Sequence, residues 1–494
     1  MFFILLVVIL VLIYIRGTSN FHYWKKKCIK YRKPVLFFGN NIQTISWRKM
    51  CWYFRRQLSN FNTSGPLIGK IGASHRFSLF LLKRHEQLNM HHTEPLLNNL
   101  FTADGDMWKL LRQKLTTAFT TGKLKLMYPL IQERALRMQN IVSEASKCGT
   151  EIDVRELMAR YTTDVIISCG FGIDTHVLTE GSSSIFRKLG RRIFHISLRD
   201  IFVALSKVLV PNFTKNWYLF APEIEKMMEI VIKDVINAKN VNRSPRIDFI
   251  DILIHLQKKG KIIGHSMVQR DANGLSKKAE IVVDNSLITA QAFILFAAGY
   301  ETSSAATSYL LHQLAYHPAE LKKCQSEIDH VILKHGALTF DSIKDMIYLK
   351  AAFDEAMRMY PPIGFVTRQC TKKYTFSNMD LTIDPGVVIF VPIQAIHNDE
   401  NYFEEPEKFK PERFLPENAP TIEKHVFLPF GEGPRTCIGS RLGYLESLTG
   451  VATILSKFSV VPSPNSRRYL ITDSTTALVQ NIKGGIPLAF VPRH

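Results

Sequence analysis

The segment from residue 285 to residue 316 constrains the fold of this chain more than any other. It is apolar along most of its length, and the proline of His317-Pro318 prevents the helix from continuing. At ~1.5 Å per residue, a helix of this length is about 50 Å long and can cross a whole domain. Within it stands the string Ala298-Gly299-Tyr300-Glu301-Thr302-Ser303. A carboxylate is costly to bury in an apolar helix, so a functional role for Glu301 is favoured over a surface residue that interrupts the helix.

A second segment places a single cysteine among glycines and an arginine. Cys437 belongs to the string Phe430-Gly431-Glu432-Gly433-Pro434-Arg435-Thr436-Cys437-Ile438-Gly439, which apolar helix formers follow. The N–H groups at the start of that helix can keep a thiolate deprotonated. Gly433 and Gly439 let the backbone approach a flat macrocycle because they lack a Cβ, and Phe430 can shield the sulfur from water. A lone cysteine is more often a small buried hydrophobe, but these neighbours favour a thiolate that binds iron.

The cysteine string resembles, position for position, the haem-binding signature of the cytochrome P450 family. The resemblance implies a mainly α-helical fold with small β-sheets, in which haem lies between the long central helix and the Cys437 loop. It implies haem b as the cofactor and O2 as cosubstrate, with the Cys437 thiolate as the axial iron ligand that favours O–O cleavage. The covalent attachment motif Cys-x-x-Cys-His is absent. Details such as Asp248-Phe249-Ile250-Asp251 look most like the insect microsomal branch, which includes detoxifying enzymes.

In this family the string around Glu301 and Thr302 is the acid–alcohol pair of the oxygen-binding helix. The resemblance implies that Thr302 holds a water beside the oxygen while Glu301 relays protons from solvent. Ala298 and Gly299 are expected to leave room against the haem. The Thr302 hydroxyl is expected to disturb the local i to i−4 hydrogen bonds and open a groove.

Three arginines and a tryptophan are the expected partners of the haem propionates. Trp108 and Arg112 are four residues apart, so on a helix they share one face. The alternative is an ordinary amphipathic helix with Arg112 in water. In the family a Trp-x-x-x-Arg pair at this place touches a propionate, and a cation beside a buried carboxylate is a sound physical role. Arg368 and Arg435 are the other two expected partners.

A structural network is predicted around Glu355 and Arg358. These residues are three apart on one helix face, directly before Tyr360-Pro361-Pro362 ends the helix. Most such pairs are solvated and contribute a few tenths of a kcal/mol. In the family the pair is buried, and an arginine in a Pro-Glu-Arg-Phe segment, here Arg413, closes it.

The resemblance implies a monooxygenase that takes electrons from NADPH through a separate reductase, since the chain has no Gly-x-Gly-x-x-Gly fingerprint. The expected substrates are lipophilic, either xenobiotics such as plant toxins and insecticides or endogenous hormones and fatty acids. Two alternatives are a reductase-independent isomerase or dehydratase of the same fold and a non-catalytic haem-binding protein. The candidate pocket residues are Phe101, Phe293, Phe296, Ile363, Phe365, Val366 and Thr475.

The ends and the composition of the chain suggest a membrane-bound enzyme. Residues 1–15 are apolar and basic residues follow from Arg16 onward, which predicts a signal-anchor transmembrane helix over residues 1–16 with its C-terminal side in the cytosol. Residues 17–40 form a basic, proline-containing linker, and residues 41–494 a single haem-thiolate catalytic domain. The net charge of +20 is dispersed, so no nucleic-acid partner is expected, whereas membrane lipid and an acidic protein are. The expected location is the endoplasmic reticulum membrane.

Most of the segment between residues 126 and 260 reads as helix. Apolar spacings of three and four predict helices over 126–141 and 224–236, and the apolar, aromatic stretch 193–222 resembles two helices above the haem pocket. Residues 260–280, with Gly264, Gly274 and several charges, are predicted to be an exposed loop.

Overall fold

The computed structural model describes residues 94–195, 197–214, 216–241, 248–376, 381–473, 476 and 478–493. The predicted anchor at 1–16 and linker at 17–40 lie outside these residues, so the domain boundaries stay predictions. The candidate pocket residue Thr475 also lies outside them. In the described ranges, no helix is long and apolar enough to span a membrane.

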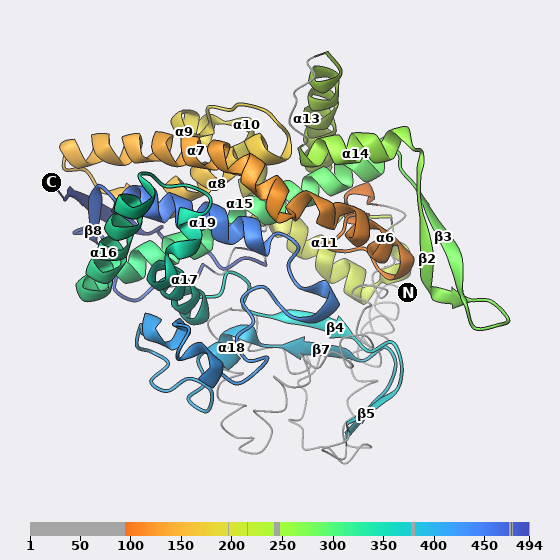
Figure 1. Ribbon diagram of the computed structural model, residues 1–494. Coiled ribbons are helices and arrows are strands. Elements are labelled where there is room, and N and C mark those ends of the chain that lie inside the picture. Colours follow the sequence, from red (N-terminus) through yellow and green to blue (C-terminus); the bar gives the residue numbers. More distant parts are fainter. Residues whose placement is uncertain are drawn as a thin grey trace, which may run out of the picture.

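Helix α15, Asn285–Tyr316, is the centre of the fold and has the bounds that the sequence predicts. Asp284 caps its first turn by accepting a hydrogen bond from the N–H of Leu287 at 2.7 Å, and Pro318 follows its end. Of its 32 residues, 24 are buried. Figure 1 shows α15 running through the middle of the helical part, so other helices must cover it on several sides.

The helices around α15 make the protein mainly α-helical, as predicted. α8 packs along α15 so closely that glycines are needed at the contact: a Cβ at Gly299 would lie 2.6 Å from Ile166 Cδ1 of α8. In the described residues, the α-helices before α15 are α6 (Gly105–Leu115), α7 (Thr121–Lys147), α8 (Val154–Gly170), α9 (Val177–Glu180), α10 (Ile185–Phe194), α11 (Leu198–Leu209), α12 (Pro211–Thr214), α13 (Pro222–Val241) and α14 (Phe249–Lys258). Those after it are α16 (Pro318–His335), α17 (Ile347–Met359), α18 (Ile393–His397) and α19 (Ser440–Leu455).

Four small antiparallel sheets complete the described fold. The three-stranded sheet has the order β1-β9-β8, with Leu488 of β9 between Ile152 of β1 and Pro462 of β8. The other three sheets have two strands each, and the β4–β7 sheet carries Arg368 opposite Ile389. The strands are β1 (Ile152–Asp153), β2 (Lys261–Arg270), β3 (Ser276–Val282), β4 (Val366–Gln369), β5 (Tyr374–Phe376), β6 (Leu381–Ile383), β7 (Val388–Val391), β8 (Phe458–Pro462) and β9 (Pro487–Pro492).

The predicted loop at 260–280 is wrong, because this segment is the hairpin β2–β3, which Figure 1 shows at the edge of the molecule. A two-stranded hairpin is marginally stable alone, and this one packs on α6. Ser266 Oγ donates to Asp106 Oδ2 at 2.6 Å, and Gly264 fits against Leu110 of α6. Gly274, which suggested a loop, is the hairpin turn with a φ of +76°.

The other predicted helices are present. The expected helix over 126–141 is part of α7, and that over 224–236 is part of α13. The stretch 193–222 contains α11 and α12, whose apolar side chains are unusually exposed: Leu198 is 86% exposed and Phe213 is 77% exposed.

Candidate active site

The Cys437 loop has a tight backbone that depends on glycine. Gly431 and Gly433 adopt positive φ values of +69° and +78°, which glycine tolerates best. The N–H of Cys437 donates to the carbonyl of Phe430 at 2.9 Å and so closes the loop. The Phe430 ring lies against Tyr444 of α19, with the ring centroids 5.0 Å apart. Phe430 therefore joins the loop to the helix that begins three residues after the thiol.

The thiol of Cys437 has the neighbours that the sequence predicts. Its side chain is reached by solvent but surrounded by protein on most sides. This burial raises the pKa of Cys437, while the backbone N–H groups of Gly439 and Ser440 and the charge of Arg112 act in the opposite direction. Burial outweighs these groups, so the protein alone does not make this residue a thiolate. A bound metal ion would, because a coordinating thiol loses its proton outright.

Three guanidinium groups converge beside the thiol. Burial lowers the pKa of Arg435 to about 10, an effect that Asp104 opposes and that the charges of Arg368 and Arg112 increase. The Arg435 Nη2 atom lies 2.7 Å from Asp104 Oδ1, and its Cζ lies 4.6 Å from the centre of the Trp108 ring. The sequence therefore predicted the members of this cluster, although Trp108 is seen to contact Arg435. Three cations that repel one another are a suitable site for an anion with two carboxylates.

One side of α15 is open at the acid–alcohol motif. Ala298 is exposed and Thr302, one turn later, is half-buried, while their neighbours on the helix are mostly buried. The Thr302 hydroxyl donates to the carbonyl of Ala298 at 2.7 Å. α15 nevertheless continues as an unbroken α-helix, so the expected disturbance does not interrupt it. Gly443 of α19 lies near Ser303, which brings the helix after Cys437 next to this motif.

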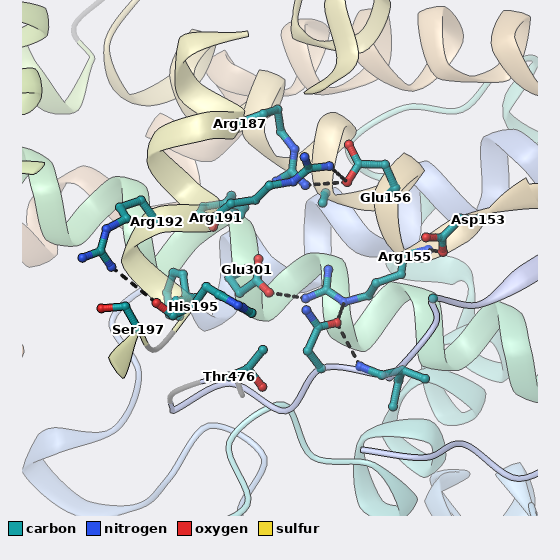
Figure 2. Close-up of a pocket in the computed structure, with 16 residues that line it drawn as sticks. Asp153, Arg155, Glu156, Arg187, Arg191, Arg192, His195, Ser197, Glu301 and Thr476 are labelled. Atoms are coloured by element: carbon teal, nitrogen blue, oxygen red, sulfur yellow. Dashed lines mark hydrogen bonds and ion pairs between the residues drawn. The ribbon is translucent and has the colours of Figure 1, made fainter. Parts of the chain in front are cut away.

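Glu301 and Gly299 face other directions than Thr302. Gly299 packs on Ile166 of α8, so its small size is needed there, and a role against haem stays a prediction. The buried carboxylate of Glu301 forms an ion pair with Arg155 Nη2 of α8 (Figure 2). Arg155 also donates to Ser304 Oγ at 2.6 Å and to Asn481 Oδ1 at 3.1 Å.

The predicted structural network is present in atomic detail. Arg358 donates to both carboxylate oxygens of Glu355, at 2.7 and 2.9 Å, and both side chains are fully buried. Arg358 also donates to the carbonyl of His397 at 2.8 Å. The imidazole ring of His397 is neutral because burial and the charge of Arg358 lower its pKa to about 3. Its Nε2 atom accepts a hydrogen bond from the N–H of Leu428 at 2.8 Å. This chain of contacts leads from α17 to the segment before Cys437, whereas Arg413 joins it through one long contact of 3.4 Å.

The role of the candidate pocket residues stays a prediction. Phe293 and Phe296 are buried in aromatic packing: the ring of Phe293 lies 5.4 Å from that of Phe220, and Phe296 stacks on Tyr300 at 5.1 Å. The remaining members in the described residues are half-buried: Phe101, Ile363, Phe365 and Val366.

Two site residues escaped the sequence interpretation. Arg155 pairs with Glu301 across 146 positions, and Asp104 pairs with Arg435 across 331. Asp104 lies four residues before Trp108, and its proximity to the recognised Trp-x-x-x-Arg pair is the sequence signal that could identify it. Arg155 stands in a polar stretch without a motif, so no local pattern identifies it.

These residues suit a flat, dianionic, iron-bearing group, and its binding here stays a prediction. The residues fit haem: a thiol is available as the axial ligand, three arginines can bind the propionates, and the small side chain of Ala298 stands on the open side of α15. The class of protein that such a site defines is a haem-thiolate protein.

Comparisons with known proteins place the chain in a family. The cytochrome P450 family pattern matches residues 80–488. Cytochrome P450 6B2 of Helicoverpa armigera is 32% identical over 98% of this chain and 97% of its own length. Cytochrome P450 6k1 of Blattella germanica is 31% identical, over 99% and 96%, and probable cytochrome P450 6a20 of Drosophila melanogaster is 32% identical, over 95% of each.

The chain belongs to the cytochrome P450 family, in the insect branch that these relatives represent. Membership makes it a haem monooxygenase that uses O2, and it confirms the predicted family and the P450 fold.

Proposed function

We propose that the protein is a microsomal monooxygenase that takes electrons from NADPH through a separate reductase and inserts one oxygen atom into lipophilic small molecules. The observation that carries the proposal is the pairing of the Cys437 loop with the Ala298–Thr302 face of α15 in a chain of this family. α19 connects the two, since it begins directly after the loop and packs on α15 at Ser303.

Different residues of the chain bind the cofactor and move protons. When bound, the haem supplies the redox chemistry that activates O2. Arg112, Arg368 and Arg435 would hold its carboxylates by charge-assisted hydrogen bonds, and Cys437 would ligate the iron. The Thr302 hydroxyl donates a hydrogen bond to the carbonyl of Ala298. The hydroxyl oxygen can therefore accept a hydrogen bond from a water on the open side of α15.

Glu301 is the proposed entry point for protons. Its carboxylate is buried but forms one wall of a pocket that reaches the surface near Arg191 and His195 (Figure 2). Water in that pocket can deliver protons to Glu301, and the adjacent residue Thr302 faces the open side of the same helix. Arg155 holds the carboxylate in place through the ion pair.

The substrates and the electron donor follow from what lines the site and from what the chain lacks. The candidate lining is apolar apart from Thr475, which favours lipophilic molecules such as plant toxins, insecticides, hormones or fatty acids. The sequence has no flavin or dinucleotide fingerprint, so electrons must come from a partner.

The location at the endoplasmic reticulum membrane is supported by the charge of the chain and by its exposed apolar surface. On α11 and α12 the side chains of Leu198, Phe202 and Phe213 are largely exposed, and a lipid surface would cover them. The net charge of +20 favours an anionic lipid surface.

Two measurements test the proposal. The reduced carbon monoxide complex should show the red-shifted Soret band of a thiolate-ligated haem, and its absence would remove the central assignment. With the band present, NADPH consumption should require added reductase and rise with lipophilic substrates. Turnover without reductase would indicate an isomerase or dehydratase, and haem binding without NADPH consumption would indicate a non-catalytic haem protein.

A further inference from the structure

A pocket of about 620 Å³ lies on the α8 side of α15, beside Tyr300 and Glu301. Its walls come from the start of α8, from α10, from α15 and from the C-terminal segment around residues 476–485. Figure 2 shows Arg187 and Arg191 directed at Glu156, and Arg155 directed at Glu301. Neither Thr302 nor Cys437 lines this pocket, whereas Glu301 of the proposed proton route does.

The lining is rich in arginine. Of the acids, Asp153 is engaged at the start of α8, where it accepts the N–H groups of Arg155 and Ile486 at 3.0 and 2.8 Å. Glu301 is engaged by Arg155. Arg192 pairs with Asp200 at 3.0 Å, so Glu156 is the acid that faces Arg187 and Arg191. The arginines that line the pocket are Arg155, Arg187, Arg191 and Arg192.

Glu156 is shared among three guanidinium groups. Its carboxylate lies 2.7 Å from Arg187, 3.1 Å from Arg191 and 3.1 Å from Arg160. Burial acts to raise the pKa of Glu156, but the charges and hydrogen bonds of these arginines lower it to about 2. One carboxylate cannot neutralise three cations, so this wall of the pocket keeps a positive excess.

Arg187 has an unused donor inside this positive region. The residue is only 4% exposed, and within the described part of the chain its buried Nε atom has no hydrogen-bond partner. A buried donor without a partner is unfavourable, and a guanidinium binds carboxylates and phosphates through two parallel hydrogen bonds. The observation points to an anionic group as the missing partner.

Apolar side chains line one part of the pocket. Ala159, Phe194 and Ile482 line it beside the Tyr300 ring, over which Arg187 Cζ lies at 5.7 Å. A volume of this size is typical of sites that hold drug-sized ligands, about 300–1,000 Å³. Arg191, which is 54% exposed, stands where a ligand would enter.

We propose that this pocket is a second ligand site, which binds an amphipathic organic anion. Arg187 and Arg191 hold the acid group, and the apolar wall at Phe194 and Ile482 contacts the hydrocarbon part. The ligand competes with Glu156 for the same guanidinium groups. The acid group is a carboxylate or a phosphate, since both match the guanidinium fork.

The test measures binding to the ferric holoenzyme whose haem iron is saturated with an azole, so that a fatty probe cannot enter through the haem site. Calorimetric titration compares dodecanoate, dodecyl phosphate and the uncharged 1-dodecanol. We expect one site for at least one of the two anions, and at least tenfold weaker binding of 1-dodecanol. Absence of binding for both anions, or equal binding of the alcohol, would overturn the proposal.

Variants then locate the site. Arg191→Leu changes an exposed position and should not disturb folding, and it is expected to weaken the affinity for the anion at least tenfold. Arg187→Leu is expected to weaken the affinity to the same extent. Arg160→Leu is the matched control, because Arg160 shares Glu156 but does not line the pocket, and it should leave the affinity within twofold.

The decisive variant is Glu156→Gln, which removes the competing charge and should tighten the anion severalfold. A merely structural role of Glu156 would weaken binding instead. Unchanged affinity in Arg191→Leu, or equal losses in Arg191→Leu and Arg160→Leu, would place the ligand elsewhere and overturn the proposal.

Discussion

Two buried glutamate–arginine pairs support the described fold, and they differ in how they are built. Glu355 and Arg358 belong to one turn of α17, are fully buried and make two short hydrogen bonds. Glu301 and Arg155 come from different helices and stand at the wall of a pocket. The first pair is closed on all sides by protein, and the second is within reach of solvent. We infer that the first fixes structure and that the second can respond to what enters the pocket.

Breaking the closed pair, Glu355 with Arg358, should cause the largest loss of stability. Glu355→Ala leaves Arg358 buried without its carboxylate, which costs about 3–5 kcal/mol. It also loosens the contacts that run through His397 to Leu428 and the Cys437 loop. We expect Glu355→Ala and Arg358→Ala to yield protein without haem, measured by the reduced carbon monoxide spectrum.

The control for this prediction is Lys344→Ala. Lys344 forms a pair of the same spacing with Asp341, but both side chains are exposed, so the loss should stay below about 1 kcal/mol with normal haem content. Normal haem content in Glu355→Ala would contradict the structural role of the closed pair.

Breaking the open pair, Glu301 with Arg155, should cause a smaller loss of stability. Arg155→Met leaves Glu301 without its cation, but water in the pocket can solvate the carboxylate, so we expect a loss of roughly 1–3 kcal/mol with haem retained. The double variant Arg155→Met with Glu301→Gln should recover part of that loss in a double-mutant cycle of thermal unfolding. A coupling energy near zero would mean that the pair does not act as a unit.

Glu446 is another buried carboxyl group to compare with these two pairs. Its hydrogen-bond partner is the hydroxyl group of Ser303, and burial raises its pKa to about 8. In the folded protein it stays protonated up to that pH, whereas in the unfolded chain it ionises above its ordinary pKa near 4.5. The folded state therefore binds one more proton between about pH 4.5 and pH 8, and its stability falls there by about 1.4 kcal/mol per pH unit.

Glu446→Gln should remove that contribution and flatten the pH dependence of the unfolding free energy between pH 5 and pH 8. The comparison of wild type and variant by chemical unfolding at pH 5, 6.5 and 8 measures it. Parallel curves would show that Glu446 ionises normally in the folded protein.

The sequence predicts the closed pair and does not predict the open one, and the reason is separation along the chain. Residues three or four apart on a helix have their relative position set by helix geometry, which is why Glu355 with Arg358 and Trp108 with Arg112 could be paired in advance. Arg155 meets Glu301 only because α8 packs on α15, where Gly299 permits the close approach. Tertiary packing of this kind has no local signal.

The same reasoning explains the hairpin β2–β3. Its turn contains Gly274 and the segment carries several charges, so its composition resembles that of a loop. The packing of Gly264 and Ser266 on α6 supports it as a two-stranded sheet. The bounds of the central helix α15 could be predicted because its stop, Pro318, is a local signal, and the structure adds Asp284 as the cap of its first turn.

The smallest effect is expected at Arg413, the third member of the closed network. It reaches Glu355 through one contact of 3.4 Å, remains partly exposed, and spends another donor on the carbonyl of Glu405 at 3.1 Å. Because Arg358 already satisfies both carboxylate oxygens, Arg413→Ala leaves no buried charge alone and should cost about 0.5–1.5 kcal/mol. Haem content should stay normal at moderate temperature, measured beside Glu355→Ala. Loss of haem in Arg413→Ala equal to that in Glu355→Ala would mean that the network depends on all three residues together, not on the two that share a helix turn.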